Sequence, residues 1–352
     1  MNKTTKQNSI DNRQMTLAVR PIGAPGAEHF SLKTTPIPEV AEGQLLLRTV
    51  YLSLDPYMRG RMSDADSYAE PVAIGDVMVG GTVNRVVTSK HPDYKAGDWV
   101  LAYTVGWQDY AVSDGTFLFK LDPSVAPVSH ALGILGMPGF TAYMGLMDIG
   151  KPKAGDTLVV AAATGPVGAT VVQIGKLMGC HVVAIAGSNE KCRVAREEFG
   201  ADVVLNHKDV DFAEKLADAC PDGIDIYFEN VGGKVFKAVL PLLNFNARIP
   251  LCGTVSGYND SELSEGRDHL NWAWSTLQTK RAAVKGFIIF DDYGDRYGEF
   301  AEQMGRWVSE GKICYLEQIV DGLESAPEGL KGLLEGKNFG KLVIRVGQDE
   351  LG

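Results

Sequence analysis

Cysteine and histidine are scarce in this sequence, and their spacing excludes several kinds of site. The chain has five cysteines and six histidines among 352 residues, and the cysteines are widely scattered. This distribution predicts neither a disulfide framework nor a compact zinc cluster. No histidine pairs with a cysteine at ligand spacing, so we expect no metal site. Scattered free thiols are typical of the reducing cytoplasm, which is the predicted location.

Positive charge and unbroken apolar runs are also limited. A net charge of -10 argues against a broad cationic surface for nucleic acid or anionic lipid. The longest apolar stretch, Leu158–Ile174, is interrupted by two glycines and a proline, so it fits a strand, turn and helix better than a membrane span. Met1–Gln14 is polar and lacks the apolar core of a signal peptide, which predicts a loose tail. We also find no Gly-x-Ser-x-Gly elbow typical of hydrolases.

Two different patterns of apolar and turn-forming residues along the chain predict an α/β protein. A single hydrophobic core rarely organises a chain of this length, so we expect two domains. Short apolar runs between Leu45 and Leu121, among them Val77–Val87, are cut by Gly, Pro and Asp, which is typical of a β-rich region. From Thr157, strands alternate with helical segments, which indicates a doubly wound parallel sheet. Its later predicted elements include the strands Ile224–Glu229 and Ile249–Cys252 and the helix Lys234–Leu243. Lys341–Val346 is a predicted strand whose residue pattern is like that of the first region, so we expect the C-terminal segment to belong to the first domain. The predicted division is 1–135 with 312–352, and 136–311.

A glycine-rich turn carries the strongest signal in the chain. Ala163-x-Gly165-x-x-Gly168 matches the dinucleotide fingerprint with Ala for the first Gly, and it lies between a predicted strand, Thr157–Ala162, and a predicted helix, Pro166–Met178. Glycines let the backbone approach a pyrophosphate, which the free N–H groups of the helix N-terminus attract. The alternative is a tight turn without a ligand, but the strand and helix on either side favour binding. The predicted contacts of the turn are Gly165, Pro166, Val167 and Gly168.

The end of the next predicted strand, His181–Ile185, favours NADPH over NADH. NAD-binding domains usually place an acidic residue about twenty residues after the turn, where it holds the ribose hydroxyls. Here the sequence reads Ala186-Gly187-Ser188, so no acid would repel a 2′-phosphate and Ser188 can donate to it. Lys191, one helical turn further, can pair with the phosphate, although an ordinary solvated lysine is the alternative. Arg193 is a second candidate for this pairing.

Motifs along the whole chain resemble those of one enzyme family. They are Ser53–Met62, Gly136–Tyr143, Ala161–Gly168, Asn230–Gly233, Cys252–Asn259, Gly286–Phe290 and Asn338–Lys341. With these motifs the chain resembles the prostaglandin reductase and leukotriene B4 12-hydroxydehydrogenase branch of the medium-chain reductases, and within it the bacterial curcumin reductases. The resemblance implies a GroES-like β-rich domain made from both chain ends, a central Rossmann domain and a homodimer.

The resemblance also implies a reaction. It implies NADPH-dependent reduction of a carbon–carbon double bond conjugated to a carbonyl, as in curcumin-like enones and 2-alkenals. Hydride would reach the β-carbon, and the resulting enolate oxygen would need a hydrogen-bond donor. Tyr258 matches the family tyrosine and is the implied donor. The implied substrate contacts are Tyr57, Tyr68 and Met137.

The resemblance also supports Lys191 and implies further cofactor contacts. They are His207, Asn230, Cys252, Ser256, Phe287, Ile288, Ile289 and Asn338. His207 stands where several relatives have a tyrosine, so cofactor binding should depend more on pH. Gly257 varies the tyrosine motif and gives its loop more freedom. Two alternatives stay open: an NADPH-dependent quinone reductase, and a noncatalytic NADPH-binding protein.

Overall fold

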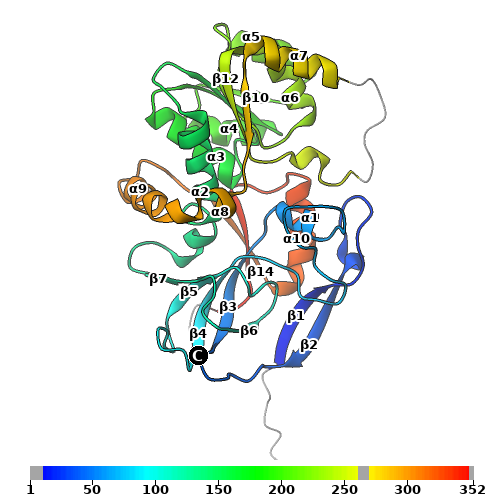
Figure 1. The fold of residues 1–352 in the computed structure, drawn as a ribbon, viewed down its shortest axis with the longest axis vertical. Coiled ribbons are helices and arrows are strands. Elements are labelled where there is room, and N and C mark those ends of the chain that lie inside the picture. Colours follow the sequence, from blue (N-terminus) through cyan, green and yellow to red (C-terminus); the bar gives the residue numbers. More distant parts are fainter. Residues whose placement is uncertain (1–10, 261–268, 349–352) are drawn as a thin grey trace, which may run out of the picture. The chain divides into compact units, whose positions relative to one another are not determined.

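The computed structural model describes residues 11–260 and 269–348, which divide between two compact units. Unit 1 comprises the residues up to 132, 319–335 and those from 342 onward, and unit 2 comprises 133–318 and 336–341. Figure 1 shows both units as ribbons, coloured along the sequence. Within the described ranges, no helix is long and apolar enough to cross a membrane.

Unit 1 is built on antiparallel sheets, as its short apolar runs predict. A seven-stranded sheet has the order β14-β15-β3-β4-β5-β7, with β6 pairing β3, and a separate hairpin pairs β1 with β2. These strands are β1 (Asp11–Leu17), β2 (Phe30–Pro36), β3 (Leu45–Ser53), β4 (Thr82–Ser89), β5 (Trp99–Ala102), β6 (Tyr110–Ser113), β7 (Leu118–Leu121), β14 (Glu317–Asp321) and β15 (Lys341–Arg345). Two helices, α1 (Tyr57–Arg61) and α10 (Ala326–Leu334), pack in the same core as β1 and β3. The last strand enters this sheet beside β3, where Val343 pairs with Ser53.

The first described strand corrects one prediction. Asp11–Gln14 falls within the predicted loose tail but forms the start of β1, whose Asp11 pairs with Pro36 of β2. The prediction was wrong here because the strand is held by polar contacts, which an apolar pattern does not reveal. The side chain of Asn12 is buried and its Oδ1 accepts from the Tyr110 amide at 2.9 Å. The rest of the predicted tail, 1–10, lies outside the described residues.

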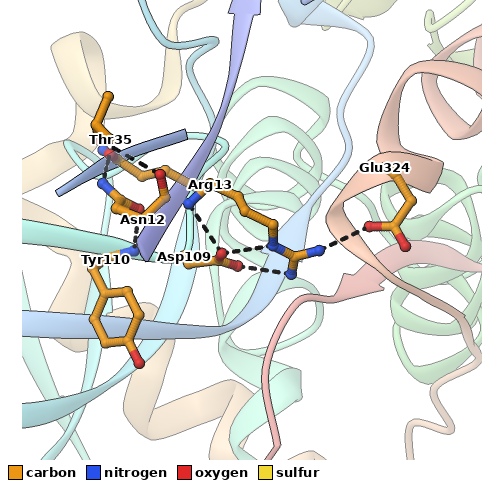
Figure 2. Close-up of polar contacts among 7 residues, drawn as sticks. Asn12, Arg13, Thr35, Asp109, Tyr110 and Glu324 are labelled. Atoms are coloured by element: carbon orange, nitrogen blue, oxygen red, sulfur yellow. Dashed lines mark hydrogen bonds and ion pairs between the residues drawn. The ribbon is translucent and has the colours of Figure 1, made fainter. Parts of the chain in front are cut away.

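Arg13 extends this polar anchor through an ion pair, drawn in Figure 2. Its Nε and Nη2 donate to the two carboxylate oxygens of Asp109 at 2.8 and 3.0 Å, and its backbone N–H donates to Oδ2 at 3.1 Å. Nη1 reaches the carboxylate of Glu324 at 3.2 Å. This arrangement joins β1 to the residue before β6 and to the short helix that begins at Leu323, all within unit 1.

We expect Asp109→Ala to destabilise unit 1 by about 1–2 kcal/mol, because it removes a bidentate pair and one backbone hydrogen bond. The Arg13 side chain is 39% exposed, which keeps the loss below that of a fully buried pair. Arg306→Ala is the matched control, since it breaks an exposed pair with Glu302 one turn away and should change stability by less than about 0.5 kcal/mol. Urea denaturation measures both variants. Equal unfolding midpoints for the two would contradict the anchoring role.

Unit 2 contains a six-stranded parallel sheet with the order β10-β9-β8-β11-β12-β13. Its strands are β8 (Thr157–Val160), β9 (His181–Ala186), β10 (Val203–Asn206), β11 (Ile224–Phe228), β12 (Leu243–Leu251) and β13 (Ala283–Gly286). Strand order runs outward in both directions from the neighbours β8 and β11, which is the doubly wound dinucleotide-binding arrangement. The predicted fold class is therefore confirmed.

Helices cover both faces of this sheet, so its central strands are buried apolar runs, whereas β13 at the edge is exposed. One core contains residues of α2 (Met137–Met144), α3 (Pro166–Leu177), α4 (Asn189–Glu197) and α9 (Tyr297–Ser309). The other contains residues of α5 (Phe212–Ala219), α6 (Gly233–Val239) and α7 (Leu270–Lys280). The short helix α8 (Ile289–Tyr293) follows β13. The carboxyl ends of the strands are left to loops, where ligands bind in this fold.

Candidate functional site

The glycine-rich turn joins β8 to α3 through a close approach of two backbone segments. Gly165 is the N-cap residue of α3, and its N–H donates to the carbonyl of Ala162 at 3.0 Å. A Cβ atom on Gly168 would lie 2.3 Å from that same carbonyl oxygen, which is too close for any side chain. Pro166 opens the helix, where its missing N–H costs nothing. The turn thus keeps a bare backbone at a helix N-terminus, as a pyrophosphate requires.

The loops after β8 and β11 are tied together at the point where the strand order reverses. The side-chain amide of Asn230 donates to the carbonyl of Ala161 at 2.8 Å, so this predicted cofactor contact also fixes the end of β8. The late segment 336–341 joins them, because the N–H of Gly340 donates to the carbonyl of Thr164 at 3.0 Å. Asn338 is buried in this segment and donates to the carbonyl of Gly340 at 2.8 Å. Ligands of doubly wound sheets bind at such reversal points.

Basic side chains gather at the end of β9, as a 2′-phosphate site requires. The Ser188 hydroxyl accepts from the Lys191 backbone N–H at 3.2 Å, which caps α4 and leaves the hydroxyl proton to donate elsewhere. A Cβ atom on Gly187 would lie 3.2 Å from Nε2 of His207 and 3.9 Å from Cε of Lys208. The two predicted residues Ser188 and Lys191 therefore share this corner with His207.

The basic residues of this corner repel one another's charge. Burial lowers the pKa of Lys191, and Lys208 lowers it further. The pKa of His207 is lowered by burial and then by Lys208, with smaller contributions from Lys191 and Lys234. A dianion placed among these groups would relieve the repulsion. Lys208 was not predicted from the sequence, although its position next to His207, at the end of a predicted parallel strand, could have indicated it as a phosphate contact.

Lys191 also has partners of its own in unit 2. Its ammonium group donates to the carbonyl of Gly336 at 2.7 Å and lies 5.4 Å from the ring centroid of Phe339. This lysine therefore links the basic corner of Lys191, His207 and Lys208 to the 336–341 segment. The second candidate, Arg193, is instead engaged in an exposed ion pair with Glu197 at 2.7 Å.

The segment after β12 carries Cys252, Ser256 and Tyr258. Burial and the nearby Glu229 raise the pKa of the Cys252 thiol to about 12, so it stays protonated. Both the backbone N–H and the hydroxyl of Ser256 donate to the carbonyl of Val231, at 3.1 and 2.5 Å. Tyr258 ends the short helix Val255–Gly257 and is half-buried. A Cβ atom on Gly253 would lie 2.8 Å from its phenol oxygen, so a side chain there would push the phenol aside.

The remaining predicted cofactor residues of unit 2 follow β13. Phe287 and Ile289 are buried in the core with α2 and α3, and the Phe287 ring packs edge-on against Tyr293. The N–H of Ile288 donates to the Asp292 carboxylate at 2.7 Å. The buried side chains of Phe287 and Ile289 thus fix the strand end. Met137 is half-buried at the first position of α2.

Tyr57 and Tyr68 lie in unit 1, and the structure brings them close to each other. Tyr57 begins α1, and burial, Asp55 and Tyr68 raise its pKa well above the ordinary value. Its hydroxyl therefore remains a hydrogen-bond donor at all ordinary pH values. Tyr68 is 59% exposed, as suits a contact with a ligand from solution. On residues 11–260 and 269–348 there is no group of three or more His, Cys, Asp or Glu side chains that could hold a metal ion.

The strand order, the glycine turn and the basic corner are those of a dinucleotide-binding fold. Two family descriptions match the chain: "N-terminal domain of oxidoreductase" over residues 13–121 and "Zinc-binding dehydrogenase" over residues 166–310.

Curated and solved relatives narrow this class. NADPH-dependent curcumin reductase of Escherichia coli (strain K12) is 64% identical over 98% of this chain and 99% of its own length. The NADP(+)-dependent 2-alkenal reductase of Nicotiana tabacum is 41% identical over 97% of this chain and 99% of its own. The crystal structure of CurA in complex with NADPH from Vibrio vulnificus is 62% identical, with a TM-score of 0.93 and coverage of 96% and 99%. The chain belongs to the medium-chain dehydrogenase/reductase family, in the branch that holds these enzymes and prostaglandin reductase 1. The resemblance read from the motifs is thereby confirmed.

Proposed function

We propose that this chain uses NADPH to reduce the carbon–carbon double bond of α,β-unsaturated ketones and aldehydes, including curcumin-like enones and 2-alkenals. The observation that carries the proposal is the arrangement in unit 2 of a bare glycine turn, a basic corner and the Tyr258 segment, in a chain whose full-length relatives bear the names of such reductases. NADPH supplies the hydride when bound.

The residues present fit this cofactor. Gly168 keeps side chains away from the turn, and the helix N-terminus beside it attracts the pyrophosphate. Ser188, Lys191 and His207 would hold the 2′-phosphate by donated hydrogen bonds and charge. The remaining contacts proposed along the dinucleotide are Gly165, Pro166, Val167, Asn230, Cys252, Ser256, Phe287, Ile288, Ile289 and Asn338.

Tyr258 is the proposed donor to the substrate carbonyl oxygen. Negative charge develops on that oxygen when hydride adds to the β-carbon, and a positioned phenol stabilises it better in the transition state than in the ground state. Tyr57, Tyr68 and Met137 are the proposed substrate contacts. In this proposal 1–135 with 312–352 forms the substrate domain, of GroES-like type, and 136–311 forms the Rossmann domain.

A panel of acceptors tests the proposed reaction. Purified protein should oxidise NADPH with enones and 2-alkenals, and mass analysis should find the saturated carbonyl product. A hydroquinone from quinone substrates, with enones left unchanged, would favour a quinone reductase. Tight NADPH binding by folded protein that reduces none of these acceptors would indicate a noncatalytic binding protein. The panel thus distinguishes the three functional hypotheses: an enone reductase, a quinone reductase and a noncatalytic NADPH-binding protein.

We expect NADPH binding to weaken as the pH rises, because His207 takes up a proton from solution when the 2′-phosphate of the cofactor binds beside it. Burial and Lys208, Lys191 and Lys234 hold the pKa of free His207 below its ordinary value of 6.5. A bound phosphate raises that pKa, so the contribution of His207 to affinity is greatest below the free pKa and is lost as the pH passes the raised pKa. The loss can reach about tenfold per pH unit within that window.

The matched control for this titration is His207→Gln, which cannot be protonated. The 2′-phosphate itself titrates near pH ~6, and the variant retains that part of the dependence. Dissociation constants for NADPH and NADH are measured by fluorescence at several pH values. A wild-type profile equal to that of His207→Gln would show that His207 does not take up the proton.

We further propose that the chain forms a homodimer in the cytoplasm, and the exposed edge of the parallel sheet supports this pairing. β13 ends the strand order, and all four of its residues are exposed. Exposed edges of this kind pair readily with a second chain. All five cysteines are free thiols, as a reducing compartment allows.

The edge-strand dimer predicts that Val284→Asp gives a monomer, because it places two like charges in a self-complementary interface. Val284 is 43% exposed and lies in β13, while Val210 is fully exposed in a loop after β10. Val210→Asp is the charge-matched control and should leave the assembly unchanged. Light scattering after size-exclusion chromatography gives the mass of each variant. A wild-type mass of one chain, or a dimeric Val284→Asp, would contradict this interface.

A further inference from the structure

Glu229 is a buried carboxylate that the proposed reaction does not use. It directly follows β11 and is 2% exposed. Its Oε1 accepts three hydrogen bonds: from the Tyr227 hydroxyl at 2.9 Å, the Val231 N–H at 2.7 Å and the Gly232 N–H at 2.8 Å. Burial raises the pKa of Glu229, while these donors oppose that rise. Burying a charged carboxylate costs desolvation free energy, so its hydrogen-bond partners indicate which part of the structure it stabilises.

The group that Glu229 holds is the loop of residues 230–233. Because the N–H groups of Val231 and Gly232 turn toward the carboxylate, the carbonyls of Asn230 and Val231 are free to face the next loop. They accept the N–H groups of Val255 and Ser256 at 3.2 and 3.1 Å. The carboxylate thus sets the position of the acceptors on which the Val255–Gly257 turn rests.

The same turn carries Tyr258. Its N–H donates to the carbonyl of Val255 at 3.3 Å, and its phenol oxygen lies against Gly253. Gly253 in turn donates its N–H to the backbone carbonyl of Glu229 at 3.2 Å. Glu229 is therefore linked to Gly253, which lies against the phenol oxygen, and through the 230–233 loop to the turn that precedes Tyr258.

We propose that Glu229 is a positioning residue that fixes the Tyr258 hydroxyl through the 230–233 loop. This inference rests on the proposed role of Tyr258 as donor to the substrate. Glu229→Gln removes the charge and replaces one oxygen by an N–H₂ group, so the N–H groups of Val231 and Gly232 lose their charged acceptor. The loop loosens, and the tyrosine oxygen departs from its place by a fraction of an ångström or more. Misplacement of this kind lowers turnover with less effect on cofactor binding.

A double-mutant cycle tests the proposal in the full-length protein. Wild type, Glu229→Gln, Tyr258→Phe and the double variant are compared with a 2-alkenal and NADPH. We expect Glu229→Gln to lower kcat about tenfold and the double variant to be no slower than Tyr258→Phe alone. Multiplying effects would overturn the proposal, because Glu229 would then act independently of Tyr258. Tyr227→Phe is the matched control, since it removes a donor from the same oxygen without touching the loop, and its kcat should stay within about twofold.

Hydrogen exchange separates this inference from the proposed function. Glu229→Gln should speed amide exchange in the segment 252–258, whatever reaction the enzyme catalyses. Unchanged exchange there would overturn the positioning role, even if turnover falls. Wild-type kcat in Tyr258→Phe would instead overturn the proposed role of the tyrosine, while faster exchange would keep the structural link. If Glu229→Gln does not fold, Glu229→Asp tests the same link, because it keeps the charge and withdraws it from the loop by one methylene.

Discussion

Replacing Tyr258 with phenylalanine is expected to lower kcat for enone reduction about 100-fold, the usual cost of removing one donor to a developing oxyanion. The ring remains, so its packing against Gly253 is preserved and only the phenol O–H is lost. The dissociation constant for NADPH should change by less than about threefold, because the lost hydrogen bond is made to substrate. Steady-state kinetics with a 2-alkenal, together with fluorescence titration of NADPH, measure the two effects.

Tyr94→Phe is the control for the loss of a tyrosine hydroxyl. That hydroxyl donates to the backbone carbonyl of Leu118 at 2.8 Å in unit 1, so its removal affects local packing alone. The kcat of Tyr94→Phe should stay within about twofold of wild type. If Tyr258→Phe also keeps wild-type turnover, a different group must meet the charge on the carbonyl oxygen.

Replacing Lys191 with alanine is expected to raise the dissociation constant for NADPH about 30-fold and to leave that for NADH nearly unchanged. A charge-assisted hydrogen bond to phosphate contributes about 2 kcal/mol, and NADH has no 2′-phosphate to lose. Lys208 and His207 remain in the corner, which limits the loss. Titrating both cofactors against wild type and variant gives the preference directly.

Two further variants show whether the effect of Lys191→Ala is specific to the charge at this position. Lys191→Arg keeps the charge and should retain most of the NADPH preference, although its geometry differs. Lys176→Ala removes a lysine paired with Asp202 at 2.6 Å and should change neither affinity. An equal loss of NADPH and NADH in Lys191→Ala would contradict phosphate recognition. It would show that the lysine acts through its bond to Gly336, which supports the 336–341 segment near the turn.

The parallel sheet was predictable where its strands are buried on both faces and form continuous apolar runs, whereas the exposed β13 was not predicted. β9 and β11 begin at the predicted residues, His181 and Ile224, and end within one residue of prediction. β12 differs, because it begins at Leu243 rather than at the predicted Ile249. Asn244, Asn246 and Arg248 interrupt its apolar pattern, so the first half of the strand has no local signal. Pairing with β11 imposes it instead.

Two other misses have local causes. The predicted helix Lys234–Leu243 ends as α6 at Val239 and continues as a 3-10 turn, because Pro241 cannot extend an α-helix. The predicted strand Val77–Val87 begins only at Thr82, after a pair of glycines. A Cβ atom on Gly80 would lie 2.8 Å from the Leu52 side chain, so this stretch packs closely on the core without forming a ladder.

The candidate site was predictable where spacing along the chain carries the chemistry. Gly168, Ser188 and Lys191 follow from the distance between a turn, a strand end and a helix. Lys208 and Glu229 do not, because their importance comes from contacts between strand ends that are distant in sequence. The carboxylate of Glu229 reads as an ordinary acid until the structure shows it buried beneath its own loop. The roles of Tyr258, Tyr57 and the cofactor contacts stay predictions.

The position of β15 has a consequence for how the chain matures during synthesis. β15 lies between β14 and β3 in unit 1, and residues 336–341 complete the turn region of unit 2 through Gly340 and Thr164. Both units therefore need residues beyond 335 before they can close. Ribosomes add about 5–20 residues per second, so the part of unit 1 up to residue 132 waits roughly 10–40 s for residue 341, whereas residues 133–318 of unit 2 wait about 1–5 s. During the longer wait the part of β3 that pairs with β15 is unpaired. Dependence on chaperones should consequently be strongest for chains still attached to the ribosome, and should fall once the last strand is free to insert.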